Sequence, residues 1–233
     1  AIVVGLAGVI VMLRPSTAGI VSLAFLVFSG AVPALAHPHV WVTYQTTVLY
    51  DKGAITGFEH VWTFDDMYTA MAVQGLDKNN DGTYDKAELT ELAQVNMDGL
   101  KDFGYFTFPK LGASELTLAG PQEPWLEHTN GILRLHFKLP LSQPVLAEAE
   151  GFNFSIHDPS YFIAFEPEKT DALKLSASAP EGCKVAFGEQ KSDPNSEELK
   201  AKLLDNAFAQ ELGKTQDIGS GFSTTASVTC AKS

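Results

Sequence analysis

A twelve-residue stretch, DKNNDGTYDKAE (residues 77–88), has the spacing of a calcium-binding loop. Oxygen donors fall at positions 1, 3, 5, 7, 9 and 12, position 7 through its backbone carbonyl: Asp77, Asn79, Asp81, Thr83, Asp85 and Glu88. Gly82 stands at position 6, where the chain must bend sharply. This is the EF-hand pattern, in which a hard cation takes six to eight oxygens. The alternative is an acidic turn that binds no ion, and the complete match favours calcium.

The sequence contains one such loop, whereas EF-hand sensors use their loops in pairs. A single loop favours a structural role for calcium, with an affinity of about 10⁻⁴–10⁻³ M, as in extracellular modules.

Two histidines one residue apart, His37 and His39, lie in the stretch PALAHPHVWV (residues 33–42). On an extended backbone their side chains share one face. Imidazoles at this spacing suit zinc, copper or nickel, and without thiolate or Met clusters zinc is the favoured metal. Pro38 has no amide proton, which excludes a site built from deprotonated backbone amides. We expect Asp158 to be the oxygen partner; the alternative is a flexible chain end whose histidines bind nothing.

The residues before this pair have the features of a secretory signal. Arg14 precedes an apolar stretch, 18–28, that is short for a membrane span, and Ala34–Ala36 (ALA) is a small-x-small cleavage site. We predict a signal peptide over residues 1–36, with Met12 as the true start, so that the first histidine becomes the mature N-terminus in the periplasm. An uncleaved membrane anchor is the alternative.

Composition limits the partners of the chain. Its 28 Asp and Glu against 16 Lys and Arg give a formal net charge of −12. So acidic a chain has no electrostatic footprint for nucleic acid and no basic patch for anionic lipid. Two cysteines, Cys183 and Cys230, predict one disulfide in an oxidising compartment, because no C-x-x-C pair is present for a metal site.

The pattern of apolar residues predicts one domain, residues 37–233. A strand hairpin at 40–50 and 54–64 precedes a helix-loop-helix insertion at about 65–103, with helices at 65–76 and 88–103. Short strands follow, with Leu133, Leu135, Phe137 and then Phe152, Phe154, Ile156 facing inward. A capping box predicts a C-terminal helix at 195–213, before a last strand at 222–230. We expect an α+β fold, mainly antiparallel β and sandwich-like, with an EF-hand-like insertion.

The order of these motifs resembles the domain-of-unknown-function 1007 family over essentially the whole mature chain. The blocks are HPHVWV, GFEHVWTFDDMY, LDKNNDGTYDKAEL and HDPSYFIAF. The resemblance implies a periplasmic component of an uncharacterised ABC-type transport system and, as partner, a membrane permease similar to nickel/cobalt transporters. Carried over by position, it implicates His37, His39, Trp62, Asp65, Asp158 and Tyr161. Where the family usually has an aromatic or aliphatic residue before Asp-Pro, this chain has His157.

These observations lead to one hypothesis and two alternatives. The hypothesis is a periplasmic transition-metal-binding protein, not an enzyme, that serves a cognate permease and carries a structural calcium site. Zinc is the favoured metal, and nickel, cobalt and copper are the other candidates. The first alternative is a calcium-stabilised β-sandwich that binds or assembles partners in the cell envelope. The second is a metalloenzyme whose N-terminal histidine binds copper for oxidative chemistry.

Overall fold

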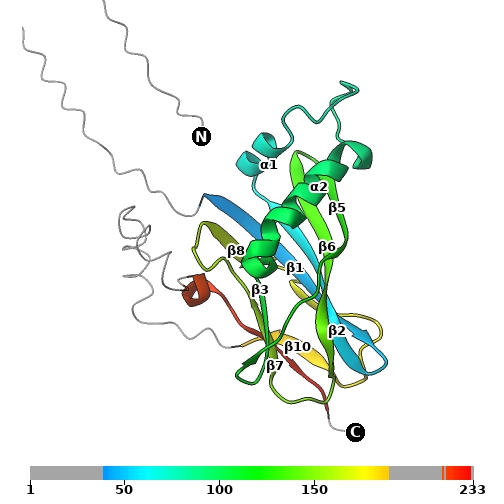
Figure 1. Cartoon of the computed structure of the whole chain (residues 1–233), viewed down its shortest axis with the longest axis vertical. Coiled ribbons are helices and arrows are strands. Elements are labelled where there is room, and N and C mark those ends of the chain that lie inside the picture. The colour runs from blue at the N-terminus through cyan, green and yellow to red at the C-terminus, as the bar shows by residue number, and fades with distance from the viewer. Residues whose placement is uncertain (1–38, 189–216, 218, 232–233) are drawn as a thin grey trace, which may run out of the picture. The chain divides into compact units, whose positions relative to one another are not determined.

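The computed structural model describes residues 39–188, 217 and 219–231, all of which fall in one compact unit. They form an α+β fold of two mostly antiparallel β-sheets and two α-helices (Figure 1). The predicted C-terminal helix at 195–213 lies outside the described residues, as do His37 and the predicted signal peptide. No helix in the described part of the chain is long and apolar enough to cross a membrane.

The first sheet has the strand order β5-β6-β2-β1-β8, and β9 also pairs with β1. Its strands are β1 (Val40–Asp51), β2 (Ala54–Phe64), β5 (Gln122–Thr129), β6 (Ile132–Leu146), β8 (Ile163–Pro167) and β9 (Leu173–Leu175). The predicted hairpin is present as β1 and β2, which pair antiparallel. β1 also pairs with β8 and β9, and both of these pairings are parallel.

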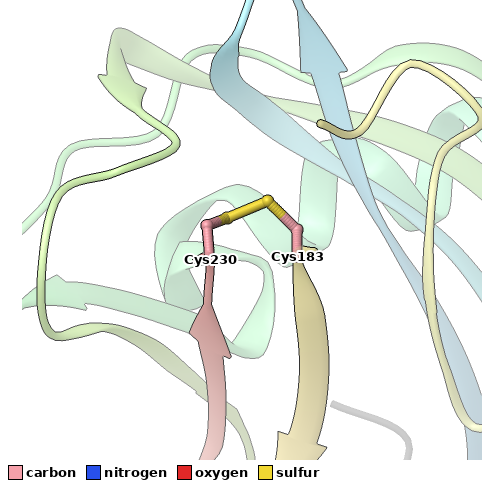
Figure 2. The surroundings of a disulfide bond; sticks show 2 residues. All are labelled: Cys183 and Cys230. Atoms are coloured by element: carbon pink, nitrogen blue, oxygen red, sulfur yellow. A yellow bond between two sulfur atoms is a disulfide. The ribbon is translucent and has the colours of Figure 1, made fainter. Parts of the chain in front are cut away.

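The second sheet has the order β10-β11-β7-β3-β4, with all pairings antiparallel. Its strands are β3 (Thr107–Leu111), β4 (Ser114–Glu115), β7 (Phe152–Ile156), β10 (Lys184–Phe187) and β11 (Ala226–Thr229). The disulfide between Cys183 and Cys230 joins the residue before β10 to the residue after β11 (Figure 2). The predicted pairing is therefore confirmed, and a disulfide of this kind is typical of oxidising compartments.

The core lies where side chains of the two sheets meet. Buried and less buried residues alternate along β1 and β6, as side chains on opposite faces of a strand require. The predicted inward residues are all buried: Leu133, Leu135, Phe137, Phe152, Phe154 and Ile156. Phe58 of β2 lies 4.8 Å from Phe154 of β7, measured between ring centroids, so the sheets are in direct aromatic contact.

Two helices follow β2, and both differ slightly from the predicted ranges. The first, α1 (Asp66–Ala72), ends early because Val73 leaves helical geometry and Gly75 adopts a left-handed φ of 77°. The second, α2 (Lys86–Leu100), starts early because Asp85 forms a capping box with Glu88. α2 packs on β5 and continues into the 3-10 turn η1 (Lys101–Phe106).

Candidate functional site

The loop between α1 and α2 is held by its own oxygen side chains. The carboxylate of Asp77 accepts hydrogen bonds from the backbone N–H groups of Asp81 (3.1 Å) and Gly82 (3.0 Å). Asn79 accepts from the N–H of Asp81 at 3.0 Å, and Asp81 from the N–H of Thr83 at 2.8 Å. Gly82, at loop position 6, has the positive φ of 79° that the sharp bend requires.

Glu88, the last loop position, ties the two ends of the loop together. Its Oε1 accepts from the N–H groups of Lys78 (2.8 Å) and Asn79 (3.4 Å), where the loop begins. Its Oε2 accepts from the N–H of Asp85 at 3.1 Å, where the loop ends. The residue is only 9 % exposed, so this carboxylate is fixed in place between the two ends.

The carboxylates of this loop face backbone amides. Within the described ranges, no three His, Cys, Asp or Glu side chains are close enough together to hold a metal ion. A hydrogen bond from a backbone amide uses only one lone pair of a carboxylate oxygen. Each of these side chains therefore keeps acceptor capacity for a cation. Hydrogen bonds from the Thr83 hydroxyl and backbone lower the pKa of Asp81 below its usual value.

His39 lies at the exposed N-terminal end of the first sheet, just before β1. Its backbone N–H donates to the carbonyl of Phe162 at 2.9 Å, and its ring lies 4.7 Å from the Phe162 ring. The side chain is exposed. His39 is thus anchored to the turn that precedes β8.

Asp65 joins the start of α1 to the start of β1. Its Oδ1 caps the helix by accepting from the N–H of Tyr68 at 2.7 Å. Its Oδ2 accepts from the N–H of Trp41 at 2.8 Å, and its own N–H donates to the Trp41 carbonyl at 3.0 Å. Asp65 therefore fixes the backbone two residues after His39.

Asp158 shapes the turn against which His39 lies. The residue is 3 % exposed. Its Oδ1 accepts from the backbone N–H and the hydroxyl of Ser160, both at 2.8 Å, and its Oδ2 from the N–H of Ile163 at 3.0 Å. Tyr161 takes a left-handed φ of 56° inside this turn and donates its N–H to the Asp158 carbonyl at 2.9 Å. Both carboxylate oxygens are engaged, so coordination by Asp158 stays a prediction while its role in the turn is observed.

The three sequence blocks around these residues come together in space. Residues 39–41, Asp65 and the turn 158–163 are far apart along the chain, yet backbone hydrogen bonds join both others to the start of β1. Trp62, also implicated by its position, is 1 % exposed and lies in the core, where its ring is 4.9 Å from that of Phe165 in β8. Trp62 therefore supports this corner of the sheet from within.

Sequence reasoning did not place His60, which is fully buried between the sheets. Its Nδ1 is 3.0 Å from the Thr46 hydroxyl, and its Nε2 is 3.4 Å from the Thr107 hydroxyl. Because Thr107 donates its proton to the Tyr105 carbonyl at 2.9 Å, it offers only lone pairs to His60. We therefore assign the proton to Nε2. Burial lowers the pKa of His60 to about 3, so the ring is neutral and structural.

His157 forms a polar pair that sequence spacing could not reveal. Its Nε2 is 3.0 Å from the carboxylate of Asp217, sixty residues away in the chain, and its ring packs 4.4 Å from that of Phe108. Asp217 also accepts from the N–H of Ser220 at 3.0 Å. The pair holds the start of the turn 219–222 against the end of β7.

The comparison with protein families decides where the chain belongs. A family model described as "Protein of unknown function (DUF1007)" matches residues 22–230. The chain belongs to the DUF1007 family. The match spans His39, the loop, the turn at Asp158 and both cysteines, so every candidate position in the described residues falls within the DUF1007 region. The chain is also similar to a protein of Haemophilus influenzae (strain ATCC 51907 / DSM 11121 / KW20 / Rd) described as "Uncharacterized protein". The two are 26% identical over 184 residues, which is 78% of this chain and 82% of that protein.

Proposed function

We propose that this DUF1007 protein is an exported transition-metal-binding protein, with zinc as the favoured metal, that serves a membrane metal permease. One observation carries the proposal: three separated sequence blocks are hydrogen-bonded together around the exposed His39. The core does not need an exposed histidine there, whereas a metal site needs an accessible imidazole on a fixed backbone. His37, two residues earlier, supplies a second imidazole at the same end of the chain.

The choice of zinc follows from the ligands that remain. Both cysteines of the chain are joined in the disulfide, so thiolate ligands are absent from the described site. Imidazoles with a carboxylate suit zinc, nickel, cobalt and copper(II), and zinc accepts such a set without a geometric preference of its own. Asp158 is the proposed oxygen ligand. It would bind the metal through a lone pair of its carboxylate that accepts no hydrogen bond from the turn.

A structural calcium ion in the loop 77–88 is the second part of the proposal. It is supported by the EF-hand spacing and by the backbone N–H hydrogen bonds that orient the side chains of Asp77, Asn79 and Asp81. Calcium would offset the mutual repulsion of four carboxylates within twelve residues. The proposed location is the periplasm, which the disulfide and the secretory features of residues 1–36 support.

Zinc titration by calorimetry tests the transition-metal site. The protein is purified after export, its N-terminus is verified by intact mass, and calcium is kept saturating. Replacing His37 and His39 by Ala should remove most of the zinc affinity, whereas His128→Ala, on β5, should not. Affinity should also fall in acid, because neutral imidazole is the binding form and protons compete with the metal. Equal zinc affinities of the wild type and the double variant would refute the site.

The second candidate is a calcium-stabilised β-sandwich that binds or assembles partners in the cell envelope without a transition metal. An open apolar pocket between α2 and the turn before β8 favours it. The same zinc titration distinguishes the two candidates, because this one predicts no tight zinc binding once calcium is saturating.

A further inference from the structure

An apolar pocket of about 480 Å³ lies between the helices and the turn that precedes β8. Its walls come from α1, α2, η1 and residues 158–163. Tyr68 of α1 and Asn96 of α2 meet in it, with the tyrosine hydroxyl donating to the Asn96 side chain at 3.2 Å. The remaining lining is largely apolar, which is typical of a binding site and uncommon on a monomer surface.

Several large apolar side chains at this pocket are exposed to solvent. Val95, Phe103 and Phe162 line it and are 60 %, 54 % and 46 % exposed, respectively. They are three of the seven large hydrophobic residues that are exposed in the described part of the chain. Met67 and Met71 are two others, and they flank the pocket residue Tyr68 on α1. Three of the exposed apolar side chains in the described residues therefore gather at one pocket.

The turn that presents Phe103 is conformationally costly. Gly104, Tyr105 and Phe106 follow it with left-handed φ values of 59°, 53° and 49°. For a non-glycine residue this conformation costs about 1–2 kcal/mol, and here two aromatic residues adopt it in succession. Phe106 points into the core, and its ring lies 5.4 Å from that of Phe103. Strain of this kind persists where the surrounding structure holds it, and it is found preferentially at ligand-binding positions.

The exposed rim of the pocket is net acidic, with three carboxylates, Glu91, Asp98 and Asp102, against one ammonium group, Lys101. Glu91 and Asp98 stand one helical turn before and one after Val95, so they flank it on the surface of α2. Asp102 directly precedes Phe103. The one charged group in the lining is Asp158, whose two oxygens already accept the hydrogen bonds of its own turn. A ligand for this surface must therefore combine apolar side chains with positive charge.

We propose that this pocket docks a segment of a partner protein that presents apolar side chains flanked by Lys or Arg. A second copy of this chain fits poorly, because two acidic rims and two net charges of −12 repel each other. An anionic membrane surface is disfavoured for the same reason. The proposal goes beyond metal binding and needs only the pocket and its rim.

The test uses a fluorescein-labelled helical peptide with Leu and Phe on one face and Lys on the other, followed by fluorescence anisotropy. Titrations contain calcium and no transition metal, so their outcome is separate from that of the zinc experiment. Glu91→Lys with Asp98→Lys should weaken binding about tenfold. The matched pair Asp51→Lys with Glu181→Lys makes the same change of net charge on exposed acids outside the pocket and should have little effect.

A second variant separates docking from charge attraction alone. Phe103→Ser removes an exposed apolar anchor and should weaken the peptide about tenfold, because such anchors dominate interface energies. Thermal melting verifies that the variant is folded. Equal losses in the two charge-reversal pairs, or unchanged affinity in Phe103→Ser, would overturn the proposal. Two other results would also overturn it. One is a dimer, seen by sedimentation, that Phe103→Ser abolishes while peptide affinity is retained. The other is binding to phosphatidylglycerol vesicles that Phe103→Ser abolishes while peptide affinity is retained.

Discussion

His60 Nε2 and the Thr107 hydroxyl, 3.4 Å apart, make a polar link between the two sheets inside a largely apolar core. His60 comes from β2 and Thr107 from the start of β3. The rings of Phe58 and Phe137 lie 5.8 Å and 5.0 Å from the imidazole, so water does not compete for these atoms. A neutral imidazole with both nitrogens partnered satisfies this position, and a charged one does not.

The protein should therefore lose stability in mild acid through His60. The pKa of His60 falls from 6.5 to about 3 on folding. Between these two values the unfolded chain binds a proton at His60 and the folded chain does not, so acid favours the unfolded state. The contribution is complete above pH 6.5 and declines by at most about 1.4 kcal/mol per pH unit toward pH 3. Urea unfolding at pH 7, 6 and 5 measures it. His60→Gln should show a shallower decline, and parallel slopes would contradict the assignment.

Glu88→Gln should abolish the response of the protein to calcium. The carboxylate is the proposed bidentate ligand, and the amide replaces one charged oxygen with a nitrogen that cannot coordinate. At tenfold excess over its dissociation constant, calcium should stabilise the wild type by about 1.4 kcal/mol. Differential scanning fluorimetry with millimolar calcium or with EDTA measures the shift. Glu91→Gln, one turn along α2, is the control, and a wild type without a calcium shift would rule out the site.

Asp158→Ala should destabilise the fold irrespective of metal. It leaves the part-buried N–H groups of Ile163 and Ser160 without their carboxylate acceptor, a loss of roughly 1–3 kcal/mol. Ser160→Ala removes the hydroxyl bond to Asp158 and a longer hydrogen bond, 3.4 Å, that the hydroxyl accepts from the N–H of Phe162, and it should cost less. Urea unfolding in EDTA compares the two variants. If Asp158→Ala unfolds like the wild type in EDTA, its carboxylate does not support the turn.

Reduction of the disulfide should lower the stability of the protein by about 4 kcal/mol on the chain-entropy account, because the bridge closes a loop of 47 residues. The double variant Cys183→Ser, Cys230→Ser should reproduce the effect of dithiothreitol on the wild type. Denaturant unfolding of both measures it. A wild type that is insensitive to dithiothreitol, although its thiols are shown to be free, would contradict this expectation.

Local patterns predicted the fold best where neighbours in sequence are neighbours in space. The alternation around Leu133 and Phe152 identified inward faces correctly, and the β-branched run at 40–50 identified β1. The parallel pairing of β1 with β8 and β9 was not foreseen, because register across more than a hundred residues leaves no local periodicity. The ends of the helices differed by a few residues because the cap at Asp85 and the left-handed Gly75 override apolar spacing.

The candidate site was predictable in part. Motif spacing located the loop at 77–88 and the block containing Asp158, since each is contiguous in the chain. The turn role of Asp158 depends on which amides its oxygens reach, and sequence suggests this only through the Asp-Pro pair. The partnership of His157 with Asp217 depends on tertiary structure alone. The apolar pocket likewise assembles from four segments that no single pattern connects.

The position of β1 in its sheet has a consequence for the order of folding. β2 follows this strand directly in the chain and can pair with it without waiting for any other element. Its parallel partners, β8 and β9, come only about 120 residues later in the chain. Contacts of such long sequence separation form late and slow the reaction. One edge of β1 therefore stays unpaired until the chain beyond β7 has reached it, so a strand whose hairpin can form early is among the last to be completed.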